Sequence, residues 1–461
     1  MKQAPEEQSP AEPSPDQPDA DAMPDVPLGT ALRFWLKLGF VSFGGPAAQI
    51  ALMHEHLVDR MRWISEARFL HALNYCTLLP GPEAQQLATY LGWLMHRNLG
   101  GIAAGLLFIL PSFVLLSALA WGYVTFGDHP LAAGLLDGVL PAVVALVLAA
   151  GWRMARRTLR TPVLLLIATA AFLGLHLLAL DFALIVAAAA LVGAGAGLLD
   201  TRTPSTAGTP LPPEQARPSL LRLGAVAAAG AALWLAGYLA CLLPGTLTEW
   251  DAGAIDTGAS APALTEMAAF FTRAALVTFG GAYAVLPYVH QAAVEQYQWI
   301  TASQMQVALA LGETTPGPLI MIVAFVAFIG GHGLQLFGPE LPVAAGWVAA
   351  LVAVYFTFLP SFVFILVGAP LVEYTRNVPR LHHALTAISA AVVGLIAELG
   401  LTLARGAVWH TDLQRPDGLA CAGAVLALWL LVVRNVSPLL VVVLFATVGA
   451  LLHLGGIGNR V

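Results

Sequence analysis

Long apolar stretches separated by short polar loops run along most of the chain. A helix of about 20 apolar residues is long enough to cross the hydrocarbon core of a bilayer. The pattern predicts six such segments in the first half: 29–53, 68–95, 101–126, 135–152, 163–180 and 182–199. It predicts one linking segment and then six more: 219–243, followed by 266–289, 304–331, 343–369, 384–404, 418–434 and 436–454. We therefore expect an all-α polytopic membrane protein.

The second set of six segments repeats the first. Residues Phe34 to Pro82 recur without a gap 236 positions further along the chain. Three pairs of matched motifs mark the repeat: Phe43-Gly44-Gly45 with Phe279-Gly280-Gly281, Pro80-Gly81-Pro82 with Pro316-Gly317-Pro318, and, after a 13-residue insertion, Pro111-Ser112-Phe113 with Pro360-Ser361-Phe362. A single linking segment separates two even sets, so the second copy starts on the opposite side of the membrane. We predict two homologous six-segment halves in inverted orientation, joined by one linking transmembrane helix.

These patterns divide the chain into six parts. They are an acidic, Pro-rich tail at 1–27, a first repeat at 28–200, a polar linker at 201–218, the linking helix at 219–243, an acidic loop at 244–265 and a second repeat at 266–461. The tail holds seven acids and one lysine, which accounts for the net charge of −6. It has no apolar run that could form a core or a signal peptide, so we expect it to be disordered.

Composition and motif content exclude several classes of protein. Charged residues make up 10% of the chain, against about 25% in soluble domains, and no basic patch typical of nucleic-acid binding is present. Cys76, Cys241 and Cys421 give neither metal-ligand spacing nor an even disulfide set. The sequence lacks the serine-elbow, zinc-helix and phosphate-loop motifs. We therefore expect no catalytic residues, no metal and no cofactor.

Arginine and lysine positions predict the orientation in the membrane. The loop after segment 135–152 holds Arg153, Arg156, Arg157 and Arg160, whereas the loops near Asp128 and Asp181 hold acids only. Basic loops favour the cytoplasm, which places the N-terminus inside. The interrupted segments either cross the membrane or form re-entrant hairpins. We favour hairpins, because the basic loop at 60–68 then lies inside and its acidic copy outside, although Arg405 and Arg415 then fall outside.

Two glycine- and proline-containing breaks interrupt the apolar segments of each half. Irregular backbone at membrane depth is tolerated only inside protein or beside water, and paired interruptions indicate a transporter's binding site. A helix that begins after such a break favours anions through its free N–H groups and its dipole. The alternative is a set of kinks that only shape the helix bundle. We predict an anion site formed by the break residues Gly44, Gly45, Pro46, Pro80, Gly81, Pro82, Gly280, Gly281, Pro316, Gly317 and Pro318.

Polar side chains near the breaks complete the predicted site. Lys37 and Arg273 occupy equivalent positions and either help to hold the anion or extend to the membrane interface. Ser42 and Thr278, also equivalent, would donate hydroxyl hydrogen bonds. The remaining candidates are Glu83, Gln86, Glu313, Thr314 and Thr315.

The two acids of this set have alternative roles. Burial disfavours a charged carboxylate, so either acid could exchange protons during transport. Otherwise Glu83 is an acid at a helix N-terminus, and Glu313 is hydrogen-bonded to its threonine neighbours. His54 and His290 also match across the repeat, and packing at segment ends is their expected role.

Several runs resemble the chromate transporter (CHR) family. They are Phe-Gly-Gly-Pro at 43–46, Leu-Pro-Gly-Pro-Glu-Ala-Gln-Gln-Leu-Ala-Thr-Tyr at 79–90, Phe-Gly-Gly-Ala-Tyr-Ala-Val-Leu-Pro at 279–287 and Thr-Thr-Pro-Gly-Pro-Leu at 314–319. The resemblance extends from Thr30 to the final apolar segment. It implies a two-domain protein that exports chromate across the cytoplasmic membrane, driven by the proton gradient or membrane potential, with sulfate as a structural analogue.

We therefore hypothesise a secondary active transporter that exports chromate across the inner membrane and confers chromate resistance. The alternatives are a passive anion channel, a transporter of sulfate or another oxyanion on the same scaffold, or an intramembrane enzyme. A tetrahedral oxyanion suits helix N-termini, hydroxyls and a cation. That chemistry does not separate chromate from sulfate, so the choice rests on the resemblance. The expected partners are the oxyanion and the lipid bilayer, with a homodimer as one option and no nucleic acid.

Overall fold

The computed structural model describes residues 24–127, 129–199, 220–250, 260–279, 282–372, 379–410 and 415–455. In the first half the helices are α1 (Leu28–Val41), α2 (Gly45–His54), the π-helix η1 (Glu55–Arg60), α3 (Glu66–Cys76), α4 (Glu83–Phe126), α5 (Pro130–Thr158), α6 (Pro162–Leu178) and α7 (Phe182–Leu199). The linking helix is α8 (Leu220–Trp250). Most of the predicted tail, the linker at 201–218 and residues 251–259 of the predicted acidic loop lie outside the described residues.

The second half follows the same order. Its elements are α9 (Ser260–Val277), η2 (Ala282–Val285), α10 (Leu286–His290), the π-helix η3 (Gln291–Gln296), α11 (Ala302–Thr314), η4 (Leu319–Met321), α12 (Ile322–Gly333), α13 (Pro342–Val372), α14 (Pro379–Val408), the antiparallel pair β1 (Trp409–His410) and β2 (Arg415–Pro416), α15 (Gly418–Val432) and α16 (Pro438–Leu454). The predicted all-α architecture is confirmed over the described residues.

Five described helices are long and apolar enough to cross a membrane, and five more are apolar but shorter. The long ones are Glu83–Phe126, Leu131–Thr158, Leu221–Leu243, Pro342–Pro370 and His383–Ala407. The chain is therefore a multi-pass membrane protein. Two details differ from prediction. The linking helix continues to Trp250 and α9 begins at Ser260, because an acid such as Glu249 marks polarity but does not end a helix.

The predicted breaks at Gly44, Gly81 and Gly317 are present between helices. Between α1 and α2 the backbone turns at Gly44, with φ of 90°, and between α3 and α4 it turns at Gly81, with φ of 124°. Gly317 has φ of 101° in the equivalent break of the second half. Such angles strain any residue with a Cβ. With 14 residues, α1 is about 21 Å long, which is shorter than the roughly 30 Å hydrocarbon core.

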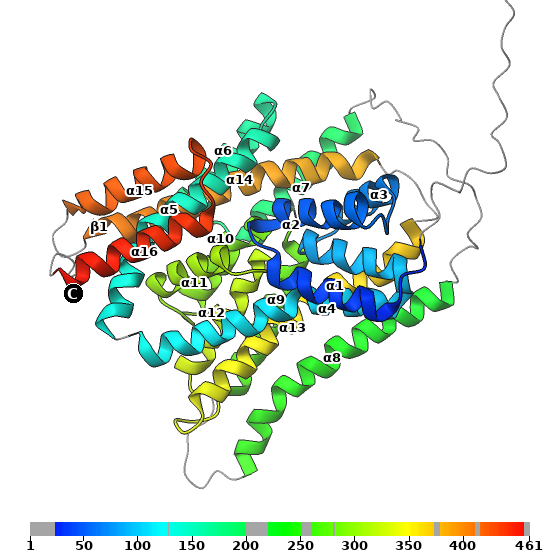
Figure 1. Cartoon of the computed structure of the whole chain (residues 1–461), viewed down its shortest axis with the longest axis horizontal. Coiled ribbons are helices and arrows are strands. Elements are labelled where there is room, and N and C mark those ends of the chain that lie inside the picture. The colour runs from blue at the N-terminus through cyan, green and yellow to red at the C-terminus, as the bar shows by residue number, and fades with distance from the viewer. Residues whose placement is uncertain are drawn as a thin grey trace, which may run out of the picture.

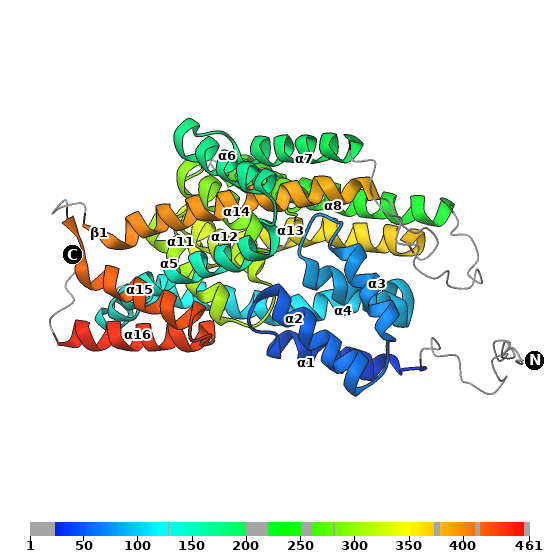
Figure 2. The ribbon, with the colours of Figure 1, turned by 90° about the horizontal axis from the view of Figure 1, so that it is seen from above.

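Local geometry repeats along with the sequence. Arg62 and its equivalent Gln298 have φ of 52° and 53°, each just after a π-helix. The offset becomes 249 residues beyond the insertion, where Ala142-Val143-Val144 on α5 matches Ala391-Val392-Val393 on α14. Figures 1 and 2 show α1, α2 and α3 grouped towards one end of the molecule and α11 and α12 nearer the other, with the long α4 running from the first end towards the second.

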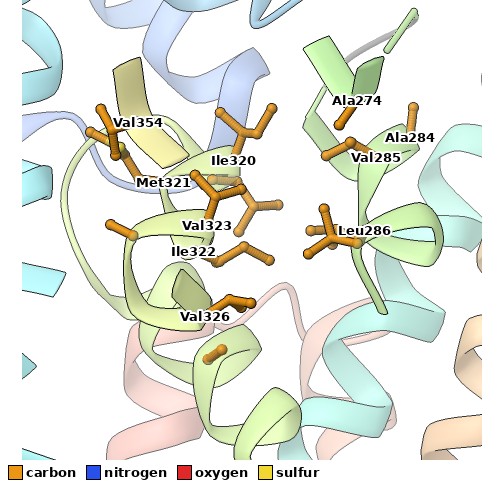
Figure 3. Packing of buried hydrophobic residues seen from close by; sticks show 14 of the residues in the cluster. Ala274, Ala284, Val285, Leu286, Ile320, Met321, Ile322, Val323, Val326 and Val354 are labelled. Atoms are coloured by element: carbon orange, nitrogen blue, oxygen red, sulfur yellow. The ribbon is translucent and has the colours of Figure 1, made fainter. Parts of the chain in front are cut away.

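The core surrounds the breaks of the second half. Every residue from Leu319 to Gly331 is buried. Figure 3 shows Ile320, Val323 and Val326 of η4 and α12 facing Val285 and Leu286 of η2 and α10. By contrast, α8 lies at the periphery (Figure 1), with large apolar side chains such as Leu221, which is 84% exposed. Close packing thus holds the irregular backbone at the centre, and exposed leucines cover the outside as expected for a lipid-facing surface.

Candidate functional site

The breaks of the two halves are joined by crossed backbone hydrogen bonds. The Gly81 N–H donates to the Thr278 carbonyl at 2.8 Å, and the Gly317 N–H donates to the Ser42 carbonyl at 2.8 Å. These two bonds are equivalent under the 236-residue offset, since each links the Pro-Gly-Pro break of one half to the Phe-Gly-Gly break of the other. Among the described residues, each Pro-Gly-Pro break thus contacts the end of the helix that precedes the Phe-Gly-Gly break of the other half. Gly280 and Gly281 themselves lie outside the described residues.

A second symmetric contact fixes the two Pro-Gly-Pro breaks. A Cβ on Gly81 would overlap the Ser361 hydroxyl on α13, and a Cβ on Gly317 would overlap Ser112 on α4. Ser112 and Ser361 belong to the matched Pro-Ser-Phe motifs. Each glycine is therefore required both for its positive φ and for a close approach to the opposite half.

Two buried glutamines line these contacts. Gln49 Nε2 donates to the carbonyls of Gly317 at 2.6 Å and Ser42 at 3.3 Å. Gln86 Nε2 donates to the Pro80 carbonyl at 2.7 Å and to Ser361 Oγ at 3.4 Å. Among the described residues, neither glutamine Oε1 has a hydrogen-bond partner. Buried polar atoms are normally satisfied, so this centre is suited to hold water or a polar ligand.

A charged cluster adjoins the breaks. The Tyr283 hydroxyl on η2 lies within electrostatic reach of both the Glu313 carboxylate at the end of α11 and the Arg153 guanidinium on α5. A Cβ on Gly45 would lie 3.4 Å from that hydroxyl, so the cluster borders the first break. Glu313 is 9% exposed, whereas Arg153 is exposed. A guanidinium facing hydrocarbon costs roughly 3 kcal/mol, so the exposed side of Arg153, five residues before the end of α5, is expected to face water or the membrane interface.

The predicted hydroxyl groups donate their hydrogen bonds to backbone carbonyls of their own helices. Ser42 Oγ donates to the Leu38 carbonyl at 2.6 Å, and Thr278 Oγ1 donates to the Ala274 carbonyl at 2.5 Å. Thr314 donates likewise to the Ala310 carbonyl at 3.0 Å. These bonds to the preceding helical turn are common for Ser and Thr. The Ser42 and Thr278 hydroxyl protons are therefore used within their own helices, whereas the sequence predicted that they would be donated to the anion.

The remaining predicted residues divide into central and peripheral ones. Thr315, Pro316 and Pro318 are buried beside Gly317, and Pro82 is buried before Glu83, the half-buried first residue of α4. Pro46, in the first turn of α2, and Pro80 are half-buried.

Lys37 and Arg273 are not brought to the breaks. Both side chains are exposed. The Arg273 guanidinium donates to Tyr297 Oη at 3.2 Å and to the Ala269 carbonyl at 3.3 Å, one turn back along α9. It thus points away from the break that follows Val277, because helical side chains lean towards the N-terminus of their helix.

Sequence reasoning missed Gln49, Tyr283 and Arg153. Arg153 was assigned to a cytoplasmic loop, yet it lies inside α5, which ends at Thr158. At the positions of Tyr283 and Arg153, the two copies of the repeat carry different residue types. The position equivalent to Tyr283 is Ala47, and the one equivalent to Arg153 is Thr402. Comparing the halves for differences, as well as for matches, would have identified them.

Together, duplication, broken helices that meet at a polar centre and an apolar exterior define a multi-pass membrane protein with a central site. A model of the family described as "Chromate transporter" matches residues 30–194 and 265–450. The chain belongs to the chromate transporter family.

Curated relatives agree with that family. The chain is 36% identical over 374 residues to the "Chromate transport protein" of Pseudomonas aeruginosa, covering 80% of each chain. It is 28% identical over 386 residues to the protein of the same name from Cupriavidus metallidurans, covering 84% of each. It is 27% identical to the "Probable chromate transport protein" of Synechococcus elongatus, covering 92% of this chain and 97% of that one. No solved structure matches the chain.

Proposed function

We propose that the protein is a secondary active transporter that exports chromate across the cytoplasmic membrane. The observation that carries the proposal is the pair of crossed breaks with Arg153 and Tyr283 beside them. The relatives' names supply the substrate, and the polar centre supplies a place for it. A dianion in a low-dielectric site needs compensating positive charge, which helix N-termini provide only in part, at about half a charge each.

In this proposal the two halves are inverted, related by an axis in the membrane plane. Support comes from the equivalence of the two crossed hydrogen bonds, from the single linking helix α8 and from the placement of α1–α3 and α11–α12 towards opposite ends (Figure 2). The short paired helices are then re-entrant hairpins. The first hairpins open to the cytoplasm with Arg60 and Arg62, and the second open outside with Glu295.

The substrate would exchange with an internal anion. In the structure, Glu313 and Arg153 both lie close to the Tyr283 hydroxyl. Chromate entering by the Arg153 side would accept hydrogen bonds from the guanidinium and the tyrosine and displace Glu313. The N–H groups at the starts of α2 and α4, after Gly44 and Pro82, would face the remaining oxygens. A passive channel needs no such exchange, because ions must leave its sites quickly.

Everted vesicles test the proposal. We expect accumulation of radiolabelled chromate when a proton gradient is imposed, competition by sulfate, and loss of accumulation when an uncoupler is added. Movement that only follows the electrochemical gradient of the anion would identify a channel. Accumulation of sulfate without chromate would assign the site to a different oxyanion.

A further inference from the structure

A polar cavity lies apart from the crossed breaks. It has a volume of about 140 Å³ and lies between the end of α6, the middle of α14 and the α10–η3 turn. Its polar lining consists of His290, Gln291, Glu295, Glu398 and Thr402. At about 30 Å³ per molecule, the cavity has room for roughly four waters.

The titratable side chains form a series from the surface inwards. The Glu295 side chain is 59% exposed, and its Oε1 lies 3.8 Å from Nδ1 of His290, whose side chain is 6% exposed. Across the cavity, Glu398 is 11% exposed, and its Oε2 lies 3.0 Å from Nδ1 of His176 on α6. That contact has ion-pair distance without hydrogen-bond geometry. Thr402 Oγ1 donates to Glu398 Oε1 at 3.2 Å.

His290 has an unused buried nitrogen. Its Nε2 is buried and has no hydrogen-bond partner among the described residues. A ring nitrogen that stays unpaired beside a polar cavity is costly unless water fills the cavity. Such water would connect the imidazole to the carboxylates, because both Glu295 and Glu398 line the same cavity.

The groups that face Glu398 come from three elements. They are His176 from α6 and, across the cavity, His290 from α10 and Glu295 from η3. Helix α7, which also packs on α14, has no titratable residue between Phe182 and Leu199. Of the other neighbours of α14, α5 carries Asp137, Arg153, Arg156 and Arg157, η2 carries Tyr283 and α11 carries Glu313. Arg153, Tyr283 and Glu313 lie near one another at the central site.

We propose that this cavity is the proton-binding site that couples proton entry to anion export, with Glu398 as the group that holds the proton. The proton passes from outside water to the Glu295 carboxylate, then through His290 and cavity water to Glu398. Each transfer moves one proton and no electrons. Residues Tyr283 to His290 form one continuous helical run. A change of charge beside His290 therefore acts on the element that carries Tyr283. This inference rests on the proposed function.

The test uses Glu398→Gln and His290→Gln in proteoliposomes. In Glu398→Gln we expect proton-driven chromate accumulation to fall at least about tenfold, while exchange of labelled for unlabelled chromate at equal pH stays within about twofold, since coupling and binding are separable. His54→Gln, the equivalent change in the first half, is the matched control and should accumulate chromate normally. Wild-type accumulation in both Glu398→Gln and His290→Gln would overturn the proposal.

A second measurement does not depend on transport. Infrared difference spectra of the purified protein between pH 8 and pH 5 should contain a protonated-carboxyl band that Glu398→Gln removes and His54→Gln keeps. If the band is unchanged in Glu398→Gln, the proton site is wrong even where chromate moves. If wild-type protein exchanges no chromate but the band is lost, the proposed function fails while the proton site stands. Should Glu398→Gln not fold, His290→Gln carries the test through a shifted band midpoint.

Discussion

The turn that joins α2 to α3 and the turn that joins α10 to α11 have the same backbone and different chemistry. In each, a histidine precedes an acid by five residues: His54 lies 3.3 Å from Asp59, and His290 lies 3.8 Å from Glu295. His54 has a second carboxylate, because its Nε2 lies 2.5 Å from Glu66. His290 has no such partner, since the position equivalent to Glu66 is Ala302.

The matched helices α5 and α14 also differ at single positions. At the position of Glu398 on α14 the first half has Ala149, and at the position of Thr402 it has Arg153. Duplication thus preserved the frame of crossed breaks and changed single residues within it. We infer that the first half supplies the cation of the central site and the second half supplies the acid of the cavity.

The largest expected effect comes from the features that the halves share. Gly81→Ala and Gly317→Ala each place a Cβ at positive φ and into the opposite half. We expect each to cost roughly 2–5 kcal/mol of stability and to abolish transport. Thermal melting in detergent measures this, with Gly122→Ala on α4 as the control, because nothing lies near its added Cβ. If only one of the two variants is destabilised, the two equivalent breaks do not contribute equally to stability.

Arg153→Ala should have the next largest effect. Removing the cation leaves the bound dianion partly uncompensated, and we expect chromate affinity to fall about 100-fold, or roughly 3 kcal/mol. Arg153→Lys should restore part of the affinity, since the charge remains but the planar fork is lost. Arg156→Ala, one turn further along the same helix, is the control. Equal losses in the Arg153 and Arg156 variants would show that only the net charge of the α5 end matters.

Glu313→Gln should act in the opposite direction. Without the competing carboxylate, chromate affinity should rise about tenfold, or roughly 1.4 kcal/mol. The Arg153→Ala/Glu313→Gln double variant should deviate from the sum of the single effects, because the two groups share Tyr283. Additive changes in measured affinity would contradict the exchange of anions.

Lys37→Ala and Arg273→Ala should have the smallest effect. Both side chains are exposed, and Arg273 is bonded to Tyr297. Chromate affinity should change by no more than about threefold, as expected for exposed charges away from the site. A larger loss of chromate affinity in binding assays at matched protein levels would show that these two cations contribute to the binding site.

The sequence predicted the glycine- and proline-containing breaks well because these breaks are duplicated. The spacing of Gly81 and Gly317 identified both breaks, and their meeting followed from two copies that share one centre. The partners of the breaks were not predictable in the same way. Gln49 reaches Gly317 across 268 positions, and Arg153 reaches Tyr283 from another helix, so both depend on tertiary packing. Arg273 was assigned to the site from its spacing alone, without allowing for the lean of helical side chains away from the break.

The crossed hydrogen bonds also set an order of events during synthesis. The Ser42 carbonyl has its partner, the Gly317 N–H, 275 residues later in the chain. At 5–20 residues per second, that partner is made roughly 10–60 s afterwards. Until then the breaks of the first half lack their hydrogen-bond partners from the second half. The first half is therefore incomplete as a membrane structure while synthesis continues. Two separately expressed halves should therefore be degraded alone and survive together.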